Sequence, residues 1–145
     1  GLNCLTKTEL NTLSKKLKHL LNPAGRFVAV AMPDFCMIES IYFFSKFRFN
    51  QIFRRKRMQQ VKVNNSIVNT YYYNPKRFNG YFKNEFTMNK TLSIGLTIPP
   101  SYLINFFAKK TNTLKFLNAI ENLFGNNIFS ASISDHYLID LIVKK

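Results

Sequence analysis

Acidic residues are scarce in this sequence of 145 residues. Seven Asp and Glu stand against 21 Lys and Arg, which gives a formal net charge of +14 at pH 7. So large a surplus of positive charge favours anionic partners, although it carries no information about the fold. The net charge therefore indicates the kind of partner, whereas the fold class follows from the order of apolar and polar residues along the chain.

Cysteine is nearly absent as well, since only Cys4 and Cys36 occur. Two cysteines cannot form a disulfide framework, and a structural zinc site needs about four nitrogen or sulfur ligands, so we predict no metal site. The sequence also lacks an apolar run of about 18 residues and a basic-then-apolar start, which excludes a transmembrane segment and a secretory signal as expectations. We expect a soluble protein of the reducing cytoplasm.

Apolar and aromatic side chains, in contrast, are plentiful. Hydrophobic residues make up 46% of the chain, and 15 Phe and 7 Tyr carry most of the bulky surface. A chain of this length suits one domain and can bury roughly 70% of its unfolded surface. We expect one folded domain with an aromatic core.

Two consecutive patterns near the start indicate the fold class. Leucines at spacings of three and four predict an amphipathic helix over 8–22, which ends at Pro23 and Gly25. The Val-rich run 26–32 stops at Pro33 and predicts a strand that is buried on both faces, as in a parallel sheet. Helix, short loop and buried strand form the second half of an α/β unit, so the predicted fold class is α/β.

Further segments alternate between helix and strand along the rest of the chain. The expected helices are 34–47, 76–82, 101–109 and 114–124. The expected strands are 61–63 and 67–73 in a hairpin, 86–98 with its alternation in the second half, and 136–143. Asn74 and Pro75 mark the start of a helix, because Asn caps and Pro fits the first helical position. Pro99 and Pro100 end the strand before them.

Several stretches occur in an order that is typical of one enzyme family. They are Gly1–Leu5, Leu20–Val28, Pro33–Glu39, Tyr71–Pro75, Ile98–Leu103 and Asp135–Ile139. In their combination and spacing they resemble bacterial class I S-adenosylmethionine-dependent methyltransferases of the small-molecule type. The resemblance covers essentially the whole chain.

The resemblance implies a partial Rossmann-like methyltransferase sheet with helical and hairpin insertions. It assigns strand five to 26–32, strand six to 92–98 and the antiparallel strand seven to 136–143. Residues 46–73 become a basic flap with a hairpin insertion, and residues 99–128 become a helical insertion over the substrate pocket. Residues 1–145 are then the carboxy-terminal part of a single methyltransferase domain.

The family's cofactor motif is a Gly-rich loop with an acidic residue nearby. This chain has five glycines, and no two of them are close enough to build that loop. The resemblance therefore implies that an amino-terminal half, which would hold S-adenosyl-L-methionine in the complete protein, precedes Gly1. We expect strand five to have an unpaired edge and the chain alone to be inactive.

Candidate pocket residues follow from where the resemblance places the ends of strands. Asn3 and Cys4 lie in the loop after strand four, and Asn3 is the first candidate for a cofactor or substrate contact. An Asn that satisfies nearby backbone groups is an equally weighted interpretation. Phe35 would form a wall of the pocket, and Glu39 would orient the acceptor or act as a base, although a solvated helix carboxylate is the favoured role for Glu39.

Tyr71, Tyr73 and His136 complete the predicted substrate site. The tyrosines alternate with Tyr72 along the expected strand, so one or two rings face the interior. Histidine side chains commonly accept protons in active sites, but a structural role at a strand end is favoured for His136. No residue is assigned as catalytic, and the sequence does not identify the methyl acceptor or its reacting atom.

An alternative function rests on the basic aromatic segment 46–62. Arg54, Arg55, Lys56 and Arg57 can neutralise phosphates, and neighbouring Phe rings can stack on unpaired bases. The chain would then be a non-catalytic module for RNA or for an anionic membrane surface. A solvated flap is the favoured interpretation, because no recognised RNA-binding motif accompanies the charge.

Overall fold

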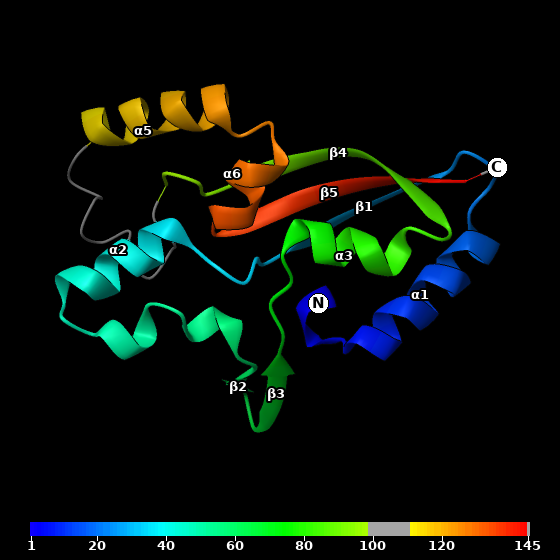
Figure 1. Cartoon of the computed structure of the whole chain (residues 1–145), viewed down its shortest axis with the longest axis horizontal. Helices are drawn as coiled ribbons and strands as arrows, with labels where there is room; N and C mark the ends of the chain where they lie inside the picture. Colours follow the sequence, from blue (N-terminus) through cyan, green and yellow to red (C-terminus); the bar gives the residue numbers. More distant parts are fainter. Residues whose placement is uncertain (99–110, 145) are drawn as a thin grey trace.

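The computed structural model describes residues 1–98 and 111–144, which form a mixed α/β fold (Figure 1). The α-helices are α1 (Lys7–Leu20), α2 (Met37–Ser45), α3 (Pro75–Phe82), α5 (Thr111–Phe124) and α6 (Ile128–Ile133). The strands are β1 (Arg26–Ala31), β2 (Gln59–Val63), β3 (Ser66–Thr70), β4 (Phe86–Ile94) and β5 (His136–Val143), and short 3-10 helices are η1 (Leu2–Cys4), η2 (Phe49–Gln51) and η3 (Arg54–Lys56).

The main sheet has three strands in the order β1-β5-β4, and β2 and β3 form a separate hairpin. The last strand, β5, lies in the middle and runs antiparallel to both neighbours; Ile139, for example, pairs with Ala29 on one side and with Thr91 on the other. Because both outer strands are antiparallel to β5, β1 and β4 are parallel to each other.

The prediction that β1 is buried on both faces in a parallel sheet is wrong. Its only partner among the described residues is β5, and the pairing is antiparallel. Ala29 and Ala31 are buried on one face, while Val28 and Val30 remain 50% and 48% exposed on the other. The run is uniformly apolar in sequence, but only one of its faces is covered.

Local capping explains where two of the helices begin. Thr6 and Glu9 form a reciprocal capping box at α1, in which the Glu9 carboxylate accepts from the Thr6 backbone N–H at 2.7 Å. Asn74 accepts from the Lys76 backbone N–H at 3.0 Å, and Pro75 takes the first position of α3. The start that Asn74 and Pro75 predicted is confirmed.

Aromatic side chains fill the core on one face of the sheet, which α1, α3 and α6 cover (Figure 1). Phe78 and Phe82 of α3 stack with ring centroids 5.0 Å apart, and Phe86 and Tyr137 from the sheet pack against them. All four side chains are almost completely inaccessible to solvent. This covered face fixes α3 against the sheet.

The opposite face of the sheet is only partly covered. Asp140 lies on it and accepts two hydrogen bonds from the Arg26 guanidinium, at 2.6 and 3.1 Å, and one from Asn89 at 2.6 Å. The hydrogen bond from Arg26 is the main reason that the pKa of Asp140 is lowered. Around this polar group Val28, Val30 and Ile94 stay largely exposed.

Other expected boundaries shift in ways that matter for the site. The strand expected within 86–98 begins at Phe86 but ends at Ile94, short of the 92–98 assigned to strand six. The strand β3 ends at Thr70, so Tyr71–Tyr73 lie outside the hairpin. The expected helix 101–109 lies outside the described residues. Within the expected insertion 99–128, α5 is helical, and the sequence did not predict α6, which Asn127 caps.

Candidate functional site

The carboxyl ends of β1 and β4 and the start of β5 lie together at one end of the main sheet, and we call this end of the strands the carboxyl edge. Ala31 pairs with Tyr137 there, and Ile94 pairs with His136. Ligands of open α/β sheets bind beyond the carboxyl ends of the parallel strands. The loops that leave this edge are therefore where a binding site is expected.

A buried ion-pair cluster centred on Arg55 lies at this edge. Its guanidinium donates to Glu39 Oε2 from Nη2 at 2.6 Å and from Nε at 2.9 Å. Nη2 also donates to Asp135 Oδ1 at 2.5 Å, and Nη1 donates to the Asp135 carbonyl oxygen at 2.8 Å. Arg54 donates a further hydrogen bond to Glu39. The cluster joins α2, η3 and the turn before β5.

The charges in this cluster balance, because two guanidinium groups face two carboxylates. Burial alone would raise the pKa of Asp135, but hydrogen bonds from His136 and Arg55 outweigh it and lower that pKa. Burial raises the pKa of the nearby Cys36 thiol, so this thiol stays protonated at neutral pH.

Cys36, Glu39 and Asp135 have possible metal-ligand atoms within 4.8 Å of one another. The Arg55 guanidinium already supplies the positive charge between the two carboxylates, and a protonated thiol is a poor ligand. The arrangement is therefore better suited to holding segments together than to holding a metal ion.

Two expectations change as a result of this cluster. Glu39 is buried and ion-paired, so the favoured interpretation of a solvated carboxylate is wrong. The Arg55 side chain is only 7% exposed and fully engaged, so it cannot neutralise a phosphate of RNA or lipid. Arg54 is paired with Glu39 and lies over the Phe43 ring, which leaves Lys56 and Arg57 as the exposed cations of the four.

Asn3 is buried and clamps two segments of backbone. Its side-chain oxygen accepts from the Met32 N–H at 2.9 Å, and its side-chain nitrogen donates to the carbonyl oxygens of Tyr71 at 2.5 Å and of Met32 at 3.3 Å. The hydrogen bonds of the Asn3 side chain therefore join the backbone after β1 to the backbone after β3. Cys4, beside it, is exposed and outside this network.

Replacing Asn3 with Ala is expected to lower the free energy of unfolding by about 2–3 kcal/mol, because buried backbone groups lose their partners. Urea denaturation followed by circular dichroism measures the change. Asn11→Ala, on the exposed side of α1, is the matched control and is expected to change stability by less than about 0.5 kcal/mol. Equal stabilities for the two variants would contradict the clamp.

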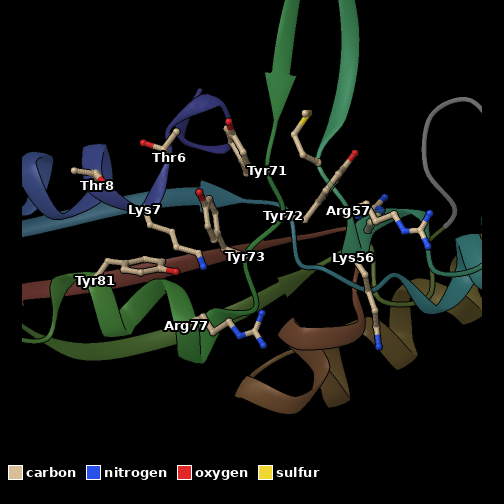
Figure 2. A pocket seen from close by; sticks show the side chains of 12 residues that line it. Thr6, Lys7, Thr8, Lys56, Arg57, Tyr71, Tyr72, Tyr73, Arg77 and Tyr81 are labelled. Carbon is tan, nitrogen blue, oxygen red and sulfur yellow. The ribbon is translucent and has the colours of Figure 1, made fainter.

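A groove of about 480 Å³ lies beside the cluster, between the start of α1, the segment after η3, the Tyr71–Tyr73 segment and α3 (Figure 2). Its lining consists of cations, tyrosines, threonines and one methionine: Thr6, Lys7, Thr8, Arg55, Lys56, Arg57, Met58, Tyr71, Tyr72, Tyr73, Arg77 and Tyr81. No Asp or Glu of the described ranges 1–98 and 111–144 lines it. The groove is therefore cationic and aromatic.

The tyrosines of this groove are held in place by contacts with residues behind them. Tyr73 is buried and donates its hydroxyl hydrogen to the Leu5 carbonyl oxygen at 2.6 Å, and Tyr71 stacks on it with ring centroids 6.5 Å apart. Burial raises the pKa of Tyr73 to about 12, so it stays neutral. Tyr72 packs against Arg55, whose Cζ lies 5.5 Å from the ring centroid. The arginine cluster thus supports one wall of the groove.

The structure brings only part of the expected pocket together. Tyr71 and Tyr73 line the groove, whereas Phe35 and His136 do not. Phe35 lies against the Phe53 ring at 6.2 Å, and His136 Nδ1 lies 3.0 Å from Asp135 Oδ2 with its side chain 39% exposed. His136 therefore belongs to the edge of the arginine cluster.

Sequence reasoning missed the groove's contributions from the helices. Lys7 is the first residue of α1, and Arg77 and Tyr81 are four residues apart on α3. Residues at that spacing share one face of a helix, which is a signal that the sequence did contain. What it could not reveal is that this face lies opposite Lys7.

Comparison of the chain with protein-family models and with curated proteins found no match. Among the helices of the described residues, none has the length and apolar character needed to cross a bilayer.

Proposed function

We propose that this chain is the carboxy-terminal part of a cytoplasmic class I S-adenosylmethionine-dependent methyltransferase, and that the complete domain methylates a small-molecule acceptor. One observation carries the proposal: β5, the last strand of the chain, lies between β1 and β4 and is antiparallel to both. The sequence resemblance expects an antiparallel strand seven, and β5 occupies the residues assigned to it. The chain would supply that end of a Rossmann-like sheet.

The outer edge of β1 and the poorly covered face of the sheet support the same proposal. No strand of the described residues pairs with that edge. Exposed apolar side chains at Val28, Val30 and Ile94 lie where further sheet and helices would bury them. Unpaired edges and bare apolar faces are liabilities that proteins normally cover. An amino-terminal half of the same domain is the partner that we propose for them.

The groove does not fit the cofactor, which carries a positively charged sulfonium. Its lining holds Lys and Arg and, among the described residues, no carboxylate that would accept hydrogen bonds from ribose hydroxyls. The groove suits an acceptor better. Methyl transfer depends mainly on alignment of nucleophile, methyl group and leaving sulfur, so the role that we propose for this chain is to hold and orient the acceptor.

The test is isothermal titration with S-adenosylmethionine of two proteins. One is this chain, and the other is the chain extended by the residues that the gene encodes upstream of Gly1. We expect stoichiometric binding by the extended protein only. Tight binding by residues 1–145 alone, or none by the extended protein, would contradict the proposal.

A second candidate is a non-catalytic basic module that binds RNA or an anionic membrane surface. The observation in its favour is a group of exposed rings, Phe44, Phe47 and Phe49, in edge contact beside the exposed Lys46 and Arg48. Salt-sensitive gel shifts with short RNA, or sedimentation with anionic vesicles, that require these cations would favour this candidate over the methyltransferase.

A further inference from the structure

We propose that the groove binds a small molecule that carries a phosphate or carboxylate group on a flat ring. This inference rests on the proposed function in one respect only: if the chain is part of a methyltransferase, this molecule is the methyl acceptor. The anion site itself depends only on the residues that line the groove.

The positive charge of the groove comes from separate parts of the chain that converge. Lys7 extends from the start of α1 and Arg77 from α3, beside Tyr73 and Tyr81, and Arg57 extends from the segment at η3 beside Tyr72 (Figure 2). Lys56 also lines the groove, but its Nζ lies over the Phe53 ring, 5.1 Å from the centroid. No Asp or Glu of the described residues lies among the cations of this lining, so an anionic group bound there would be attracted by their charge. The groove therefore has a charge that an anionic group would complete.

Intramolecular carboxylates do little to neutralise these side chains. The ion pairs among the described residues include none with Lys7, Lys56 or Arg57, and Arg77 is 3.9 Å from Asp34 with its side chain 75% exposed. Arg55 differs, because Glu39 and Asp135 already neutralise it. Its role in the groove is to support Tyr72.

The tyrosines provide the second half of the recognition. Tyr71, Tyr72 and Tyr81 offer ring faces and hydroxyls, and Thr8 at the start of α1 adds one more hydroxyl. Tyr73 is fixed by its hydrogen bond to Leu5 and by edge contact with Tyr81 at 5.7 Å. A flat ring gains from such a preformed aromatic wall, because aromatic groups favour stacked or edge-on contacts.

The size of the groove favours a small molecule over a polynucleotide. Its volume of about 480 Å³ lies within the range of small-molecule sites, which is roughly 300–1,000 Å³. Grooves for single-stranded nucleic acid instead follow a backbone over several nucleotides. The experiment therefore has to distinguish binding of a small aromatic anion from binding of RNA.

The experiment is calorimetric titration of the chain at low salt with phenyl phosphate, benzoate, inorganic phosphate and phenol. We expect phenyl phosphate or benzoate to bind at least about tenfold more tightly than phenol, because charge-assisted hydrogen bonds are the stronger kind. The better of the two anions identifies the acidic group. Inorganic phosphate is expected to bind more weakly than phenyl phosphate, because it lacks the ring.

Arg57→Gln and Arg77→Gln are each expected to weaken binding of the preferred anion about tenfold, a loss typical of one charge-assisted contact. Arg48→Gln removes the same charge from an exposed position outside the groove and is the matched control. Unchanged circular dichroism shows that each variant is folded.

Three results would overturn the inference: phenol binding as tightly as the anions, an equal loss in Arg48→Gln, or tight binding of short RNA that depends on Arg57 when phenyl phosphate does not bind. None of these titrations uses S-adenosylmethionine. A methyltransferase proposal that failed on cofactor binding would leave the anion site standing, and a failed anion titration would leave the methyltransferase proposal standing without an acceptor class.

Discussion

Replacing Glu39 with Gln is expected to lower the free energy of unfolding by about 3–5 kcal/mol, because it removes one charge of a buried pair. Glu39 is 2% exposed and accepts hydrogen bonds from both Arg54 and Arg55. The Arg55 charge cannot move to water when its partner is lost, since only 7% of that side chain is exposed. Asp135 alone would then have to neutralise it.

Urea denaturation of the unsubstituted chain and of Glu39→Gln measures this loss of stability. Glu85→Gln is the matched control, because Glu85 pairs with Lys18 at 2.7 Å on the surface, where both partners remain solvated. We expect the control to leave stability nearly unchanged. If Glu39→Gln cost no more than the control, the arginine cluster would not be a structural element of this edge.

Features of the fold that depend on neighbouring residues were predictable from the sequence, and features that depend on distant residues were not. The start of α3 was predicted because Asn74 and Pro75 act on the next few residues. The strand β5 was predicted over the same bounds, 136–143, because apolar residues on both sides of Asp140 favour a strand. The burial of Arg55 was not predictable, because its partners lie 16 and 80 positions away along the chain. A run of basic residues carries no sign of which member is internal.

The residues of the groove and its surroundings also fall into those that the sequence predicted and those that only the tertiary structure reveals. Tyr71 and Tyr73 were expected at a pocket and do line the groove. Asn3 was expected there too, with backbone support as the equal interpretation, and its observed hydrogen bonds are all to backbone. Lys7 and Arg77 join the groove through the packing of α1 beside α3, which depends on tertiary structure.

Replacing Phe82 with Ala is expected to lower the free energy of unfolding by about 3–5 kcal/mol, the range for loss of a large aromatic side chain from a core. Phe82 is completely buried, and its ring centroid lies 5.0 Å from that of Phe78, 5.6 Å from that of Phe27 and 5.9 Å from that of Phe86. These partners come from α3 itself, β1 and the start of β4, so one truncation weakens the contact between helix and sheet.

Phe47→Ala is the matched control for this substitution, because the same ring is 82% exposed at that position. We expect chemical denaturation to show little change for Phe47→Ala and the full loss for Phe82→Ala. The contrast also tests the orientation of the sheet, since Phe82 packs on the face that α1, α3 and α6 cover. A small effect at Phe82 would contradict the conclusion that this face holds the core of the fold.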